Sequence, residues 1–302
     1  MFSWLNTHLD TASVIIGTTF GLLARVLMLR SDYRQYPAYP HGKVIHLSLG
    51  LIAGALGAVA VPALFNKDYT AITFLALAAQ QFREVRNMER NTLTKIDQLE
   101  LVPRGVAYIE GIAVVFEGRN YLAILTAFMA SLFVMLIGWW CGIIVGILCI
   151  GVVFRLMRGT TIKVIAQIER ADVVFDGPNL YVGDVYMMNV GLDENRDIIA
   201  HEGMGFILTP KNDDAKVTIA NLGQRQAILY DVSTRLGVYR DDGDPMLLPI
   251  SKLGLRTGKL GLLVLPREKD WDKAIEAVNS VPLLESAVRK PTVANRKSTQ
   301  EG

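Results

Sequence analysis

The sequence predicts a multi-pass α-helical membrane domain followed by a cytosolic α+β domain that is rich in β-strands. Of the 302 residues, 51% are hydrophobic, and the mean hydropathy is positive, whereas a soluble protein of this size usually has a negative mean. The apolar residues are concentrated before Arg158, and after it strand-length apolar runs alternate with turn residues. We therefore expect a membrane domain at 1–159, an α+β domain at 160–290 and a disordered polar tail at 291–302.

Composition and short motifs exclude several classes of protein. The formal net charge of +2 predicts no broad basic face for nucleic acid. Cys141 and Cys149 lie in one apolar run, which argues against a disulfide framework. No Cys/His cluster or phosphate-binding glycine motif is present, so we expect no metal and no cofactor. The N-terminus lacks a basic region and a cleavage site, which favours an uncleaved first span.

Five apolar segments are interpreted as membrane spans, because about 20 apolar residues of helix cross the hydrocarbon core. The segments are about 12–29, 44–65, 69–82, 120–137 and 139–157. In the second, Gly50, Gly54 and Gly57 are spaced for close helix packing. The third is shorter, and two interpretations stay open: a span that continues into a charged helix, or an interfacial helix. Trp139 and Trp140 are typical of a turn at a membrane interface.

Basic residues in the loops predict the orientation of the spans. Three clusters follow the first, third and fifth segments: Arg30, Arg34 and Lys43; Arg83, Arg86, Arg90, Lys95 and Arg104; and Arg155, Arg158 and Lys163. With five spans, all three clusters lie on one side, which places the N-terminus outside and the C-terminal domain in the cytoplasm. With four spans the clusters would lie on opposite sides, so the charges favour five.

The segment 103–119 is too apolar for a free loop and too interrupted for an ordinary span. Glu110 and Glu117 are seven residues apart and share one face if the segment is helical. A carboxylate at membrane depth indicates a functional site. The alternative is an interfacial amphipathic helix in which both glutamates face water. Arg25, near one end of the first span, is expected to extend toward the interface.

The C-terminal half has the pattern of an α+β domain. Strands are predicted at 163–168, 171–175, 180–189, 205–209, 215–220 and 260–265. Helices are predicted at 223–236 and 268–279. Turn residues occur at Asp176–Asn179 and at Asp241–Pro245.

Two stretches carry a resemblance to a known family. Residues Tyr108, Ile109, Glu110, Gly111, Ile112 and Ala113 form the sequence that gives the YIEGIA family its name, and the stretch 220–229 is similar to that family's soluble domain. The resemblance covers both halves of the chain. It implies a protein of endospore-forming bacteria that is linked to sporulation and lies in the cell membrane, in the forespore or spore inner membrane. It also implies a membrane-bound protease role, without an agreed catalytic set.

Candidate catalytic residues are the carboxylates Asp176, Asp231 and Glu110. The layout of the chain resembles that of a sporulation aspartic protease, which needs two carboxylates that share a proton. Asp176 has an apolar lead-in and is followed by Gly177, but the usual Thr or Ser between them is missing. The alternative is a plain hairpin turn. Asp231 is four residues from Arg235 on a predicted helix, which also suits a surface ion pair.

Whether the chain is an enzyme stays open at this point. One hypothesis is a membrane-anchored protease that acts on spore membrane proteins. The alternative is a non-enzymatic membrane scaffold or signalling protein whose cytosolic domain binds a protein partner. A third hypothesis is a transporter or channel component, but the sequence shows no inverted repeat that would support it. The expected partners are the lipid bilayer, a protein partner or substrate, and other copies in a homo-oligomer, with no nucleic acid.

Overall fold

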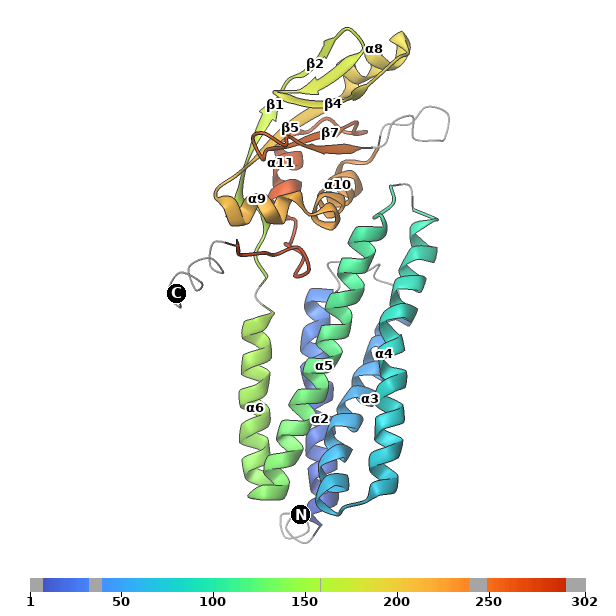
Figure 1. Cartoon of the computed structure of the whole chain (residues 1–302), viewed down its shortest axis with the longest axis vertical. Coiled ribbons are helices and arrows are strands. Elements are labelled where there is room, and N and C mark those ends of the chain that lie inside the picture. Colours follow the sequence, from blue (N-terminus) through green and yellow to red (C-terminus); the bar gives the residue numbers. More distant parts are fainter. Residues whose placement is uncertain (1–7, 33–39, 101, 158, 239–248, 292–302) are drawn as a thin grey trace, which may run out of the picture. The chain divides into compact units, whose positions relative to one another are not determined.

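The computed structural model describes residues 8–32, 40–100, 102–157, 159–238 and 249–291 (Figure 1). The predicted turn at Asp241–Pro245 and the predicted disordered tail, except Pro291, lie outside the described residues. The chain divides into two compact units. The first contains Met1–Arg90 and Ile112–Arg158, and the second contains Asn91–Gly111 and Gly159–Gly302.

Long helices make up the first unit, namely α2 (Leu9–Asp32), α3 (Pro40–Phe65), α4 (Tyr69–Asp97), α5 (Val106–Leu136) and α6 (Trp139–Leu156). Among the described residues, α2, α3, α5 and α6 are long and apolar enough to cross a membrane. This confirms the predicted multi-pass architecture. Helix α4 does not meet the same criterion, although Phe74 and Leu77 of its apolar half are exposed. A crossing at 69–82 therefore stays a prediction.

Small residues bring the helices of the first unit close together, as the glycine spacing predicts. A Cβ on Gly54 would lie 2.9 Å from the Thr18 carbonyl oxygen, and one on Gly21 would lie 2.7 Å from the Gly54 Cα. Ser131 on α5 donates a hydrogen bond to the Ala58 carbonyl at 2.9 Å. Close backbone approach of this kind is how helices associate where lipid removes the hydrophobic driving force.

The prediction of two separate segments at 103–119 and 120–137 is wrong. One continuous helix, α5, runs from Val106 to Leu136. A glycine inside a helix costs only about 1 kcal/mol, so Gly111 and Gly118 do not interrupt it. At about 1.5 Å of rise per residue, α5 is longer than the hydrocarbon core requires. Its first residues, 106–111, belong to the second unit, as do the last residues of α4.

Two antiparallel sheets form the centre of the second unit. The larger has the order β1 (Ala166–Ala171), β5 (Met204–Pro210), β7 (Leu260–Val264) and β6 (Ile250–Leu253). The smaller has the order β2 (Val173–Asp176), β3 (Asn179–Val182) and β4 (Val185–Asn189). Together with the helices of this unit, the sheets confirm the predicted α+β class.

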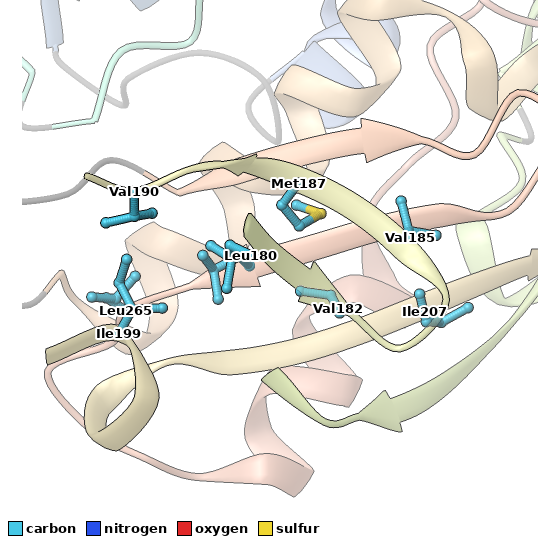
Figure 2. Close-up of a cluster of buried hydrophobic side chains, with 9 residues drawn as sticks. Leu180, Val182, Val185, Met187, Val190, Ile199, Ile207 and Leu265 are labelled. Atoms are coloured by element: carbon cyan, nitrogen blue, oxygen red, sulfur yellow. The ribbon is translucent and has the colours of Figure 1, made fainter. Parts of the chain in front are cut away.

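The helices of the second unit are α7 (Ile162–Ile165), α8 (Asp193–Glu202), α9 (Asp213–Ala220), α10 (Leu222–Leu236) and α11 (Trp271–Ser280). Helices α9, α10 and α11 lie on one face of the larger sheet, and the smaller sheet lies on the other (Figure 1). Alternate residues of β5 point to the two faces of the larger sheet. Phe206 points to the helical face and packs on Trp271 of α11, with 5.2 Å between ring centroids. Ile207 belongs to the core between the sheets (Figure 2).

Several predicted elements of this unit differ from the structure. Residues 180–189 form two strands, because Gly183 adopts a φ of +56° in a turn between them. Residues 215–220, predicted as a strand, belong to helix α9. The Asn212 side chain caps this helix by accepting a hydrogen bond from the Ala215 backbone N–H at 2.8 Å. Residues 163–165, predicted as the start of a strand, belong to helix α7, and the strand β1 begins at Ala166. Helix α8 and strand β6 are not among the predicted elements, whereas α10 and α11 confirm the two predicted helices within three residues.

Candidate functional site at the start of helix α5

The link between α4 and α5 is held by the carboxylate of Asp97, the last residue of α4. Its two oxygens accept hydrogen bonds from the backbone N–H groups of Arg104, at 2.5 Å, and Gly105, at 3.2 Å. Gly105 has a φ of +84°, a conformation that residues with a Cβ rarely adopt. Helix α5 begins at the next residue, so this link fixes how the helix starts.

Arg104 connects the link to helix α10. The residue is 2% exposed. Its Nη1 lies 3.3 Å from Glu100 Oε1, and its Nη2 donates a hydrogen bond to the Tyr230 hydroxyl at 2.6 Å. The guanidinium carbon also lies 4.3 Å from the centroid of the Tyr230 ring. A buried charge with both a carboxylate and an aromatic partner is compensated, and it fixes the position of α10 beside the link.

Gln226 of α10 holds the first turn of α5. Its Oε1 accepts a hydrogen bond from the Tyr108 backbone N–H at 3.1 Å, one of the four donors that lack a partner within the helix. The Tyr108 ring meets the Tyr230 ring edge-on, with 6.2 Å between centroids. A Cβ on Gly223 would lie 2.7 Å from the Ala107 carbonyl oxygen, so only a glycine allows this approach.

Gln224, two residues earlier on α10, holds the C-terminal segment of the domain. Its side chain is fully buried, donates to the Pro282 carbonyl at 3.2 Å and accepts from the Leu284 backbone N–H at 2.8 Å. A Cβ on Gly111 of α5 would lie 2.9 Å from the Ser286 Oγ of that same segment. The two glutamines thus join α5 and the C-terminal segment to the start of α10.

The two stretches that carry the family resemblance therefore meet in the structure. Tyr108 and Gly111 come from the first, and Gln224 and Gln226 come from the second. Tyr108, Ile109, Ile112 and Ala113 are all buried, whereas Glu110 is partly exposed. Neither stretch supplies a nucleophile next to a base. We call the contact of Asp97, Arg104, Tyr108, Gln226 and Tyr230 the junction.

Asp231 lies beside the junction and is partly exposed. Burial raises the pKa of its carboxyl group to about 6, although the charges of Arg235 and Arg104 act in the opposite direction. Burial also raises the pKa of the neighbouring Tyr230 hydroxyl. The carboxyl group of Asp231 therefore changes its protonation state near pH 6.

Asp176 and Glu117 occupy other places. Asp176 is exposed at the end of β2, opposite Asn179, and the two-residue turn that follows it contains Gly177 with a φ of +56°. The hairpin turn that was the alternative for this motif is therefore present. Asp231 lies on a helix on the other face of the larger sheet, so these two carboxylates are not brought together (Figure 1). Glu117 forms an ion pair with Arg86 of α4 at 3.3 Å.

Sequence reasoning did not identify Arg104, Gln226 and Tyr230 as site residues. In the sequence Arg104 is only one of several loop charges, and Gln226 lies within the second stretch without a motif that suggests its role. The usable signal was the position of Gln224 three residues after the N-cap Asn221, whose side chain accepts a hydrogen bond from the Gln224 N–H. Gln226 lies in the same first turns of the helix. Among the described residues, no group of three or more His, Cys, Asp or Glu side chains is arranged to hold a metal ion.

Comparisons with known proteins support the family resemblance that the two stretches carry. The family described as YIEGIA protein matches residues 13–294. The chain is 52% identical over 279 residues to a Bacillus subtilis (strain 168) protein described as uncharacterized protein YphB, which covers 92% of this chain and 94% of the relative. No solved structure matches.

Proposed function

We propose that this chain, which belongs to the YIEGIA protein family, is a membrane-anchored scaffold or signalling protein. Its α+β domain binds a protein partner, and the junction couples that domain to the helices α4 and α5. We place it in the membrane of the sporulating cell, with the α+β domain in the cytoplasm. The family resemblance supports the sporulation setting, and the basic loops support the orientation.

The observation that carries this proposal is the membership of residues 91–111 in the α+β unit. A domain that is merely anchored needs no more than a tether to its membrane helices. Here the end of α4 and the start of α5 are instead part of the folded domain, fixed by Asp97, Arg104 and Gln226. A change in the domain is therefore passed to α5 through side-chain contacts rather than through a loose linker.

The protease hypothesis has weaker support. It requires two carboxylates that share a proton, and the described residues of a single chain provide no such pair at Asp176, Asp231 or Glu110. The protease hypothesis then requires that Asp176 side chains from two copies of the chain form the pair. The exposed position of Asp176 would allow such a pair. This form predicts that Asp176→Asn stops cleavage of a substrate.

One experiment separates the two functions. A photo-crosslinking amino acid is placed in the full chain, in membranes of sporulating cells, at the exposed apolar positions Val174, Tyr186, Val217, Leu222 and Leu255. We expect a discrete adduct with one other protein from at least one position. In an Asp176→Asn strain, no uncleaved membrane protein should accumulate that is absent from the wild type. Failure to form an adduct at all five positions contradicts the binding function, and an uncleaved protein that accumulates only in the variant supports the protease.

A further inference from the structure

The smaller sheet presents an apolar row on the face that points away from the larger sheet. Leu180, Val182 and Val185 point inward to the core (Figure 2). Val174, Tyr181 and Tyr186 alternate with inward residues and lie directly opposite one another across the three strands. The Tyr181 and Tyr186 rings are 5.6 Å apart between centroids. Val174 is 51% exposed and Tyr186 is 43% exposed, so this row is available for contact.

The layer that carries this row is strongly acidic. Residues 172–202, which form the smaller sheet and α8, contain one arginine, Arg196, and seven carboxylates: Asp172, Asp176, Asp184, Asp193, Glu194, Asp197 and Glu202. Three of them pair with a base, namely Asp184 with Lys259, Asp193 with Arg196 and Glu202 with Lys269. The other four have no ion-pair partner within the described part of the chain. The whole chain has a formal charge of +2, so this acidity is local.

A polar groove continues the acidic surface beyond one end of the sheet. It has a volume of about 550 Å³, and Glu169, Asp172 and Asp184 line it. Arg170 and Lys259 also line the groove. The Arg170 guanidinium is bound to Asp272 at 2.7 Å and lies 5.2 Å from the Trp271 ring centroid, and Lys259 pairs with Asp184. Both bases of the groove thus have acidic partners, whereas Glu169 and Asp172 have no ion-pair partner among the described residues and remain available to a cation.

We propose that Val174, Tyr181 and Tyr186, with Asp172, Asp176 and the groove around them, form the surface on which the α+β domain binds its partner. The partner segment carries lysine or arginine next to a large apolar side chain. This inference rests on the proposed function and names the chemistry of the partner. An apolar centre with a charged rim is the usual arrangement of a protein interface, and the acidic rim selects a basic partner and speeds its association. It also repels nucleic acid and anionic lipid.

Peptides of defined composition test this surface. The full chain in nanodiscs is titrated with a fluorescent peptide of alternating lysine and valine, and with two controls in which glutamate replaces lysine or serine replaces valine. We expect the lysine–valine peptide to bind at least about tenfold more tightly than either control, and less tightly as salt rises, because the contact combines charge with apolar burial. No binding of this peptide, or equal binding of all three, overturns the proposal.

Matched variants locate the binding. Val174→Ser with Tyr186→Ser should weaken binding about tenfold, and Asp172→Asn with Asp176→Asn should weaken it and reduce its salt dependence. Val217→Ser with Leu222→Ser, on α9 and α10, is the matched control and should change nothing. Weakening by the control pair instead of the first pair refutes this surface. In cells, an adduct from position 217 with none from 186 also refutes it, yet leaves the proposed binding function intact.

Discussion

At the scale of single residues, the junction depends on a few buried or half-buried side chains. Arg104 is held by Glu100 and Tyr230, and Gln226 accepts from the Tyr108 backbone. Loss of one partner leaves the buried guanidinium of Arg104 or the Tyr108 N–H without compensation, which costs free energy. Arg104 and Gln226 are therefore the substitutions that report most directly on the junction.

Arg104→Met should destabilise the α+β unit by about 3 kcal/mol, because it removes a buried cation and leaves the carboxylates of Asp97 and Glu100 without their positive charge. Arg104→Lys keeps the charge but loses the two-sided contact with Glu100 and Tyr230, so its effect should be smaller. Thermal unfolding of the two variants in the same detergent checks this order. Equal unfolding temperatures for Arg104→Met and the wild type would contradict the role of Arg104.

Asp231 predicts how stability depends on pH. Its pKa is raised to about 6 in the folded chain from an ordinary value of 3.8. The folded state therefore holds the proton more tightly than the unfolded state, and this contribution to stability is lost as pH rises from about 4 to about 6. Asp231→Asn should remove this decrease in stability, because asparagine does not titrate. The variant should be more stable than the wild type above about pH 6 and of similar stability below about pH 4. Unfolding temperatures across this range test the sign, and a wild type that gains stability relative to the variant as pH rises would refute it.

At the scale of elements, the helices of the first unit depend on glycines at close contacts. A Cβ on Gly54 would press on the Thr18 carbonyl oxygen of α2, and one on Gly57 would overlap the Ile124 carbonyl of α5. A Cβ on Gly118, by contrast, would meet no atom of the described residues within 4 Å. Gly54 and Gly57 are thus needed for close packing of the helices, whereas Gly118 is not.

Gly57→Ala should therefore separate α3 from α5 and lower the unfolding temperature in detergent. Gly118→Ala, its control, should leave the temperature unchanged or raise it, since alanine favours a helix by about 1 kcal/mol over glycine. Both variants are compared by thermal aggregation of the purified full chain. An equal effect of the two substitutions would show that helix propensity, rather than packing, decides the outcome.

Helix α5 also shows what the sequence could not predict at this scale. Gly111, Gly118 and the charges near them suggest a break, but neighbouring residues favour helix and the junction holds its first turn. Residues 215–220 contain enough β-branched side chains for a strand, yet the Asn212 cap and two aspartates in the first turn make a helix. Local capping and tertiary contacts outweighed periodicity in both cases.

At the scale of the whole molecule, hydropathy and turn spacing were sufficient to predict a membrane half and an α+β half. They did not predict that residues 91–111 belong with the second half, because the contacts of Arg104 and Gln226 join residues that are far apart in the sequence. The role of Asp176 could not be predicted either, because Asp176 followed by Gly177 suits both a catalytic turn and a hairpin turn. Its exposed place opposite Asn179 could be known only from the strand register.

The coupling of the α+β domain to α5 is tested most directly by hydrogen exchange of the full chain in nanodiscs. Gln226→Leu removes the acceptor for the Tyr108 N–H, worth about 1 kcal/mol, whereas Gln226→Glu retains an acceptor oxygen. We predict that Gln226→Leu speeds amide exchange about fivefold in residues 91–97 and 106–111 and leaves exchange in β2, β3 and β4 unchanged. In Gln226→Glu, most of the protection of residues 91–97 and 106–111 should be retained. Unchanged exchange at 106–111 in Gln226→Leu would contradict the account.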